Sequence, residues 1–126
     1  MKVCVLCLQK FKDYQNKNRR RCGSCNTKIR RFRAKAAAIE YLGGKCERCG
    51  WSGNQAAFQF HHKDSNTKEF TVGNAANKSW DSIKKEIRKC ILLCANCHMI
   101  RHSTKDEKRF LKEALNYKGR TLKRQD

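Results

Sequence analysis

The sequence predicts a small α+β fold that depends on more than a hydrophobic core for its stability. The chain has 126 residues, and its 39% hydrophobic content includes nine cysteines. A chain of this length and composition buries little apolar surface. Eight of the cysteines occur in four C-x-x-C pairs, "CVLC", "CGSC", "CERC" and "CANC". Strand-like and helix-like segments alternate between the pairs, which favours a mixed architecture.

The spacing of the cysteine pairs predicts two structural zinc sites. A C-x-x-C turn presents two thiolates to one metal ion, and two turns complete a tetrahedral site. Disulfides are the alternative, but the apolar run from Val3 to Leu8 is shorter than the roughly 7–15 residues of a signal-peptide core. We therefore expect a cytoplasmic protein that is not secreted and keeps its thiols reduced.

Sequence separation predicts which pairs share a zinc ion. Fourteen residues separate the first two pairs, and forty-four separate the last two. The expected ligand sets are Cys4, Cys7, Cys22 and Cys25 for one ion, and Cys46, Cys49, Cys94 and Cys97 for the other. A swapped pairing remains possible, although it requires the two halves to interleave. The ninth cysteine, Cys90, precedes "ILL" and is expected to be a small buried hydrophobic residue.

Four regions follow along the chain. We expect an N-terminal Cys4 zinc finger at 1–27, a basic connecting helix at 28–44, a second zinc-containing domain at 45–117 and a basic tail at 118–126. The connecting helix is capped by Asn26 or Thr27 and stopped by Gly43-Gly44. Its predicted apolar face consists of Ile29, Phe32, Ala36 and Ile39.

The second domain is expected to contain a strand and several helices. "AAFQFHH" predicts a strand, "SWDSIKKEIRK" a helix with Ser79 as its cap, and "CILL" a short buried segment. A last helix is expected from Ser103 or Thr104 to about Tyr117. The aromatic residues assigned to the core are Trp51, Phe58, Phe60 and Trp80.

The charge of the chain predicts a polyanionic partner. Thirty Lys and Arg residues face eleven Asp and Glu residues, giving a net charge of +19. Twelve of the thirty cations lie in residues 1–35 beside the single acid Asp13. Nucleic acid is the expected partner and an anionic membrane surface the competing one, although no segment is long enough to span a bilayer. The expected DNA contacts are Arg19, Arg20, Arg21, Lys28, Arg30, Arg31, Arg33 and Lys35.

All four histidines fall in two short motifs. His61 and His62 end the predicted strand, and His98 and His102 are one helical turn apart after the last C-x-x-C. The second zinc site would bring strand and helix together, so we expect the four histidines to converge on one cleft. Such a cleft suits phosphodiester cleavage, which needs a base to deprotonate water and a metal ion to stabilise the leaving oxygen.

Residues 46–102 resemble the HNH endonucleases, on "CERCG", "FHHKD", "SWDSIKKEIRKC" and "LLCANCHMIRH" in that order. The resemblance implies a ββα-metal (His-Me finger) core, with His61, His98 and His102 as ligands of a catalytic Mg²⁺ or Mn²⁺. It implies that His62 is the general base and that the products carry a 5′-phosphate and a 3′-hydroxyl. Its two-knuckle version is similar to phage and bacterial enzymes of the homing or nicking type.

Lys89 departs from the family pattern, in which an Asn occupies this position. A lysine is not expected to replace an amide that braces the loop, so either another group holds His62 or the enzyme has diverged.

We therefore expect a metal-dependent endonuclease acting on double-stranded DNA. The alternatives are a non-catalytic zinc-finger protein that binds nucleic acid, such as a regulator or packaging accessory, and an RNA-directed enzyme. The target sequence, nicking or double-strand cleavage, and the monomeric or dimeric state are not determined by these motifs.

Overall fold

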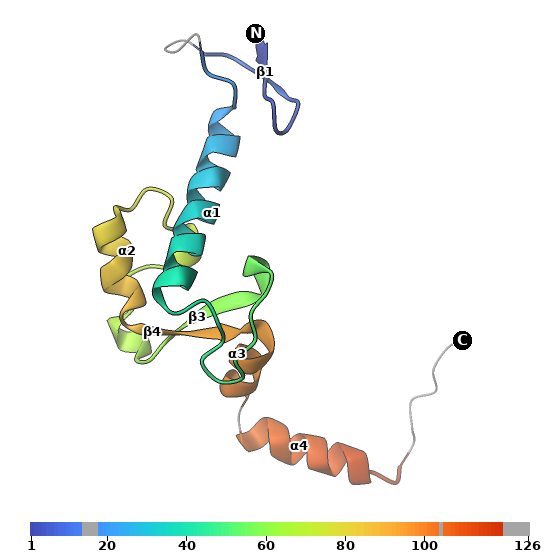
Figure 1. Cartoon of the computed structure of the whole chain (residues 1–126). Coiled ribbons are helices and arrows are strands. Elements are labelled where there is room, and N and C mark those ends of the chain that lie inside the picture. The colour runs from blue at the N-terminus through green and yellow to red at the C-terminus, as the bar shows by residue number, and fades with distance from the viewer. Residues whose placement is uncertain (14–17, 104, 120–126) are drawn as a thin grey trace.

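The computed structural model describes residues 1–13, 18–103 and 105–119 and shows a small α+β fold (Figure 1). Within these residues, 3₁₀ turns lie at Gln55–Ala57, Ser65–Thr67 and Val72–Asn74. The strands and helices are β1 (Lys2–Val3), β2 (Lys10–Phe11), α1 (Gly23–Tyr41), β3 (Phe58–His62), α2 (Trp80–Ile87), β4 (Cys90–Cys94), α3 (Ala95–His102) and α4 (Lys105–Asn116).

The antiparallel pair of β3 and β4 lies between the helices. Its register pairs Phe58 with Cys94 at one end and His62 with Cys90 at the other. Alternate side chains of a strand point to opposite faces of the sheet. Phe58 and Phe60 pack toward Ile39 of α1, while α3 packs on the opposite face. The sheet thus separates an α1/α2 side from an α3 side, and this division determines where each histidine points.

Helix α1 begins earlier than the sequence predicts. It starts at Gly23, and the side chain of Cys22, not of Asn26 or Thr27, accepts a hydrogen bond from the backbone of the first turn. The expected boundary between residues 27 and 28 therefore lies inside the helix. The predicted stop is confirmed, because Gly43 and Gly44 both adopt positive φ angles. Their N–H groups donate to the carbonyls of Glu40 and Ile39, which is the Schellman pattern.

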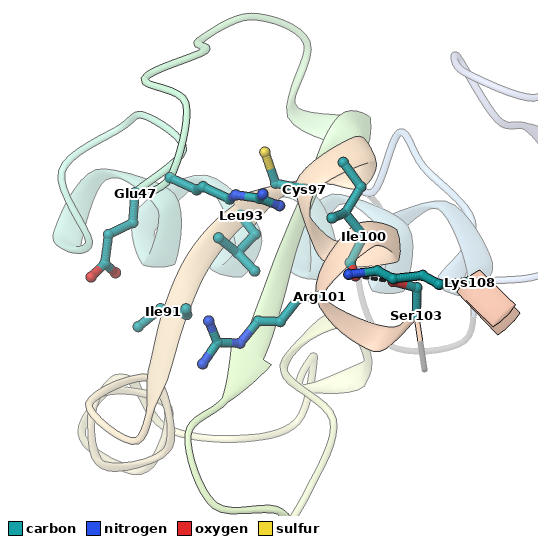
Figure 2. Close-up of a pocket in the computed structure, with 9 residues that line it drawn as sticks. Glu47, Ile91, Leu93, Cys97, Ile100, Arg101, Ser103 and Lys108 are labelled. Atoms are coloured by element: carbon teal, nitrogen blue, oxygen red, sulfur yellow. Dashed lines mark hydrogen bonds between the residues drawn. The ribbon is translucent and has the colours of Figure 1, made fainter. Parts of the chain in front are cut away.

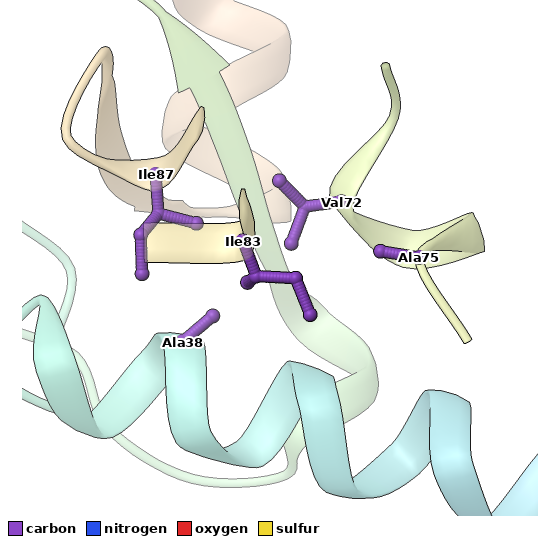
Figure 3. Close-up of a cluster of buried hydrophobic side chains, with 5 residues drawn as sticks. All are labelled: Ala38, Val72, Ala75, Ile83 and Ile87. Atoms are coloured by element: carbon purple, nitrogen blue, oxygen red, sulfur yellow. The ribbon is translucent and has the colours of Figure 1, made fainter. Parts of the chain in front are cut away.

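The predicted apolar face of α1 is wrong at two of its four positions. Phe32 is 64% exposed, and Ala36 is exposed too. Ile29, in contrast, is half-buried and Ile39 is buried. The C-terminal half of the helix packs against α2 (Figure 1). There Ala38 faces Ile83 and Ile87 of α2 in the cluster of Figure 3. The periodicity was correct for a helix, but it could not reveal which half would be covered.

The other predictions of core residues are confirmed for some side chains and wrong for others. Phe58 and Cys90 are buried, as expected, and Phe60 is half-buried. The two tryptophans are 38% and 40% exposed and are not core residues. Trp51 lies against the ring of Phe58, and Trp80 packs edge-on against Tyr41. Each indole therefore covers the margin of a core that is too small to enclose it.

The last helix, α4, extends away from the sheet (Figure 1). It ends at Asn116, one residue before the predicted end, and Thr104 lies outside the described residues. Its large apolar side chains, Phe110, Leu111 and Leu115, are exposed. Of the predicted basic tail, residues 120–126 also lie outside the described part. None of the described helices has the length and apolar character needed to cross a membrane.

Replacement of Ile87 by Ala should lower the free energy of unfolding by about 2–5 kcal/mol, because it leaves a cavity between α1 and α2. Phe32→Ala is the matched control and should change it by less than about 0.5 kcal/mol, because that ring is exposed. Urea unfolding of the zinc-loaded proteins measures both. A larger effect for Phe32 than for Ile87 would contradict the observed packing of α1.

Candidate metal sites and active site

Eight cysteines form two clusters of four, with the expected pairing. Cys4, Cys7, Cys22 and Cys25 make one cluster, and Cys46, Cys49, Cys94 and Cys97 make the other. The sulfurs of Cys7 and Cys22 are 3.8 Å apart, as are those of Cys49 and Cys94. Zinc–sulfur bonds of about 2.3 Å in a tetrahedron place sulfurs about 3.8 Å apart. Both clusters therefore have the composition and the spacing of structural zinc sites.

The two clusters share one backbone plan that the sequence analysis did not identify. In each, the fifth residue of the knuckle, Leu8 or Gly50, has a positive φ and donates its N–H to the first cysteine's carbonyl. In each, the third cysteine accepts a hydrogen bond from the fourth and caps a helix. Val5 and Glu47 donate to the residue two positions before that cap. The N-terminal finger and the second zinc site are thus the same structural unit used twice.

The protonation of the cysteines explains why a cation belongs in each cluster. Hydrogen bonds from the backbone N–H of Cys7 and Cys22 lower the pKa of Cys4 to about 6. The hydrogen bond with Cys22, together with burial, raises the pKa of Cys25 to about 12. Cys46 and Cys97 repeat this contrast in the second cluster. In each cluster one cysteine ionises readily and another resists ionisation, so a divalent cation is needed to hold four thiolates together.

Three of the four histidines converge. Nδ1 of His61 lies 3.2 Å from Nε2 of His102, which lies 3.0 Å from Nε2 of His98. Nitrogens bound to one ion at about 2.1 Å are about 3.0–3.4 Å apart in octahedral or tetrahedral geometry. We call these residues the histidine triad. Their ring nitrogens, contributed by β3 and by adjacent turns of α3, have a spacing that fits a single metal ion.

The environments of His61 and His98 favour neutral imidazoles. Burial lowers the pKa of His61, and the nearby charges of Arg101 and His102 lower it further. Burial also lowers the pKa of His98. A neutral imidazole offers a lone pair to a metal ion, whereas an imidazolium does not. The triad is thus ready for metal binding near neutral pH.

The expectation that all four histidines meet is wrong for His62. His62 follows His61 directly, so the pleat of β3 directs its side chain to the opposite face. There its Nε2 lies 2.7 Å from Oε1 of Glu86, on α2. The side chain of His62 is only 9% exposed. The two adjacent histidines therefore belong to different surroundings on the two sides of one strand end.

Glu86 is the functional candidate that the sequence analysis missed. It is a carboxylate only 1% exposed, and it also accepts a hydrogen bond from the backbone N–H of Glu69. Burial acts to raise its pKa, but the hydrogen bonds from His62, Glu69 and Lys89 outweigh burial and hold the pKa at about 2. A signal existed, because Glu86 lies between the buried helix positions Ile83 and Ile87.

Lys89 braces the loop in a way that the sequence analysis did not foresee. Its ammonium donates to the carbonyl of Thr67 at 2.8 Å and to Glu86 at 3.1 Å. A lysine works here because both partners are acceptors, and an ammonium supplies several donors. Of the alternatives raised by Lys89, the structure shows the first, in which another group, Glu86, holds His62.

A cavity of about 490 Å³ opens between β4 and α3, beside the second zinc site (Figure 2). Ile91, the cross-strand partner of His61, lines it, so it lies on the triad's side of the sheet. Arg48, Arg101 and Lys108 give it a cationic rim, with Glu47 as an acid beside them. The cavity thus lies on the triad's face of the sheet, although none of its lining residues belongs to the triad.

The eight predicted DNA contacts fall on separate surfaces. Arg19, Arg20 and Arg21 line a cavity at the N-terminal finger, where Arg19 also stacks over Phe11. Lys28, Arg31 and Lys35 line a second cavity along α1. Arg30 and Arg33 line neither of these two cavities.

No family model, curated protein or solved structure matches this chain. Membership of the HNH family therefore stays a prediction, and its support comes from the sequence motifs and the geometry of the site.

Each Cys4 cluster should hold one zinc ion. We expect Cys25→Ala and Cys97→Ala each to contain one zinc ion fewer per chain than the wild type, because each removes a ligand from a different cluster. Cys90→Ala is the matched control and should retain the wild-type content, since Cys90 belongs to neither cluster. Elemental analysis of protein purified under reducing conditions gives the content. An unchanged zinc content in both ligand variants would refute the assignment.

Proposed function

We propose that the protein is a metal-dependent endonuclease that hydrolyses phosphodiester bonds of double-stranded DNA, with an HNH-type ββα-metal core. The observation that carries the proposal is the convergence of three imidazole nitrogens beside a histidine held by a buried carboxylate. The triad belongs to a strand and to the helix that follows its partner strand. The net charge of +19 supplies the attraction for the DNA backbone.

The triad, His61, His98 and His102, would hold the catalytic divalent ion. Three imidazoles favour a transition metal ion over Mg²⁺, which prefers oxygen ligands. When bound, the ion supplies Lewis-acid stabilisation of negative charge on the phosphate and on the leaving 3′ oxygen. Arg101 stands close enough to affect the pKa of His61 and offers a second positive charge to the same phosphate.

His62 would act as the general base. Ionised Glu86 can only accept a hydrogen bond, so Nε2 of His62 carries a proton, and in the neutral imidazole Nδ1 keeps the lone pair. Nδ1 takes a proton from water while the water oxygen bonds to phosphorus and the bond to the 3′ oxygen breaks; the 3′ oxygen leaves as an alkoxide and takes up a proton from solvent water. The products then carry a 5′-phosphate and a 3′-hydroxyl. Because His61 and His62 are the last two residues of β3, a phosphodiester that crosses the strand end reaches both faces.

One observation favours the alternative of a non-catalytic zinc-finger protein that binds nucleic acid. His62 is almost buried and lies on the face away from the triad. Its bond to Glu86 would then be structural, a role typical of a satisfied core histidine.

His62→Ala should reduce cleavage of supercoiled plasmid by at least about a hundredfold, because it removes the proposed base, while duplex binding stays within about twofold. The zinc-loaded proteins are assayed with Mg²⁺, Mn²⁺, Zn²⁺ or no added ion, with Lys63→Ala as the adjacent exposed control. Cleavage by His62→Ala at the wild-type rate would remove His62 from the mechanism. A wild-type protein that binds the plasmid but cuts it with none of these ions would support the non-catalytic alternative.

Glu86→Gln should lower kcat by at least about tenfold with KM unchanged, because a neutral amide no longer fixes the proton on Nε2 of His62. Glu86→Asp, which keeps the charge, should recover part of the lost rate. Thermal unfolding and DNA binding of both variants are measured in parallel. If the rate falls only in proportion to the fraction of folded protein, Glu86 is structural and does not position His62.

A further inference from the structure

Two cavities on the α1 side of the sheet share lining residues. The larger, of about 430 Å³, lies along α1 and is lined by Lys28, Arg31, Phe32, Lys35 and Gly73. The smaller, of about 130 Å³, includes Lys35 and Gly73 again and ends beside His62 and Lys68. We call the two together the α1 groove. It connects the exposed face of the basic helix with the residue proposed as the general base.

The cations of the α1 groove stand in one row. Lys28, Arg31 and Lys35 are three and four residues apart, which puts them on one face of α1 over about 10 Å of helix. Arg33, equally basic and on the same helix, lies outside the row and lines neither cavity. This arrangement suits contacts with successive backbone phosphates, because the positive charges repeat along a line.

The α1 groove lacks its own counter-charge. No acidic side chain lines either of its cavities, in contrast to the cavity of Figure 2, where Glu47 stands beside the arginines. Lys35 is partly buried, and burial lowers its pKa. Among the described residues its ammonium makes no ion pair with a carboxylate. An ammonium taken partly out of water without a partner costs free energy, which an anion from outside would recover.

The exposed ring of Phe32 fits the same surface. It is 64% exposed at the wall of the larger cavity, between two cations. Aromatic side chains next to phosphate-binding cations are typical of surfaces that contact the sugars or bases of nucleic acid. This contact accounts for a large apolar side chain that the fold leaves uncovered.

We propose that the α1 groove binds the phosphodiester backbone of one strand of duplex DNA, with one phosphate in the small cavity between Lys35, Lys68 and His62. The inference rests on the proposed function only in taking DNA as the substrate. It also predicts how the bound DNA strand is positioned, because a phosphate fixed beside His62 determines which part of the DNA strand reaches the end of β3. It further divides the predicted DNA-contacting basic residues into those that bind a phosphate directly and those that only contribute to the overall positive electrostatic potential.

The test compares Lys35→Gln with Arg33→Gln, which remove the same charge from different faces of α1, two residues apart. Duplex binding is measured against salt concentration without added Mg²⁺ or Mn²⁺, so the result does not depend on cleavage. Lys35→Gln should weaken binding about five- to tenfold and reduce the slope of log K against log salt by about one, the effect of one lost phosphate contact. Arg33→Gln should weaken it by less than about twofold.

Equal losses of DNA affinity in the two variants would overturn the proposal that the α1 groove binds a phosphate, because nonspecific electrostatic attraction predicts equal effects. Preferential binding of structured RNA over duplex DNA would overturn its DNA assignment. The melting temperature of Lys35→Gln should equal or exceed that of the wild type, since the change removes an unpaired, partly buried charge; a clear decrease would mean that Lys35 supports the fold. A protein that shows the Lys35 effect but cuts no DNA would refute the nuclease and leave the α1 groove standing.

Discussion

The second Cys4 cluster is the constraint on which the arrangement of the candidate site depends. It joins the knuckle at Cys46 and Cys49 to the junction of β4 and α3, across a chain separation of 45 residues. Leu93, Cys94 and Cys97 are buried around it. Closing a loop of this length costs conformational entropy, which metal–thiolate bonds can repay in a small domain. The same junction starts the helix that carries His98 and His102, so the cluster also sets the position of two triad residues.

The repeated zinc unit shows how one local geometry performs two different tasks. In the N-terminal copy, the unit ends in α1 and projects that helix with its cations exposed. In the second copy, the unit ends in α3 and presses that helix against β3. The knuckle geometry costs more in the first copy, because Leu8 takes the left-handed conformation that Gly50 adopts without strain. What differs between the copies is therefore the helix that each carries and the surface on which it packs.

Charge is distributed in opposite ways on the two sides of the sheet. On the α3 side, the ring nitrogens of the histidine triad lie close enough together to hold a cation. On the α1 side, a buried carboxylate satisfies His62 and Lys89, while Lys35 forms no ion pair with an acidic side chain in the part of the chain that the structure describes. The carboxylate of Glu86 is nevertheless buried in this strongly cationic chain. Its burial costs desolvation, which is offset by hydrogen bonds from His62, Lys89 and the backbone N–H of Glu69.

The sequence by itself determined the parts whose chemistry is local. The C-x-x-C spacing predicted both cysteine clusters, and the i, i+4 spacing of His98 and His102 placed them together on one helix. The glycine pair predicted the end of α1. These features depend on residues a few positions apart, for which turn and helix geometry leave few alternatives.

Only the tertiary structure decided which distant residues meet. It separated His62 from the triad through the pleat of β3, paired it with Glu86 across 24 residues and left Phe32 64% exposed on α1. Sequence patterns show which residues share one face of a helix or strand, but not which other element packs on that face. That packing decides burial, hydrogen-bond partners and pKa. The local sequence therefore indicated the candidate metal ligands, whereas the surroundings of the proposed base, His62, could be known only from the folded structure.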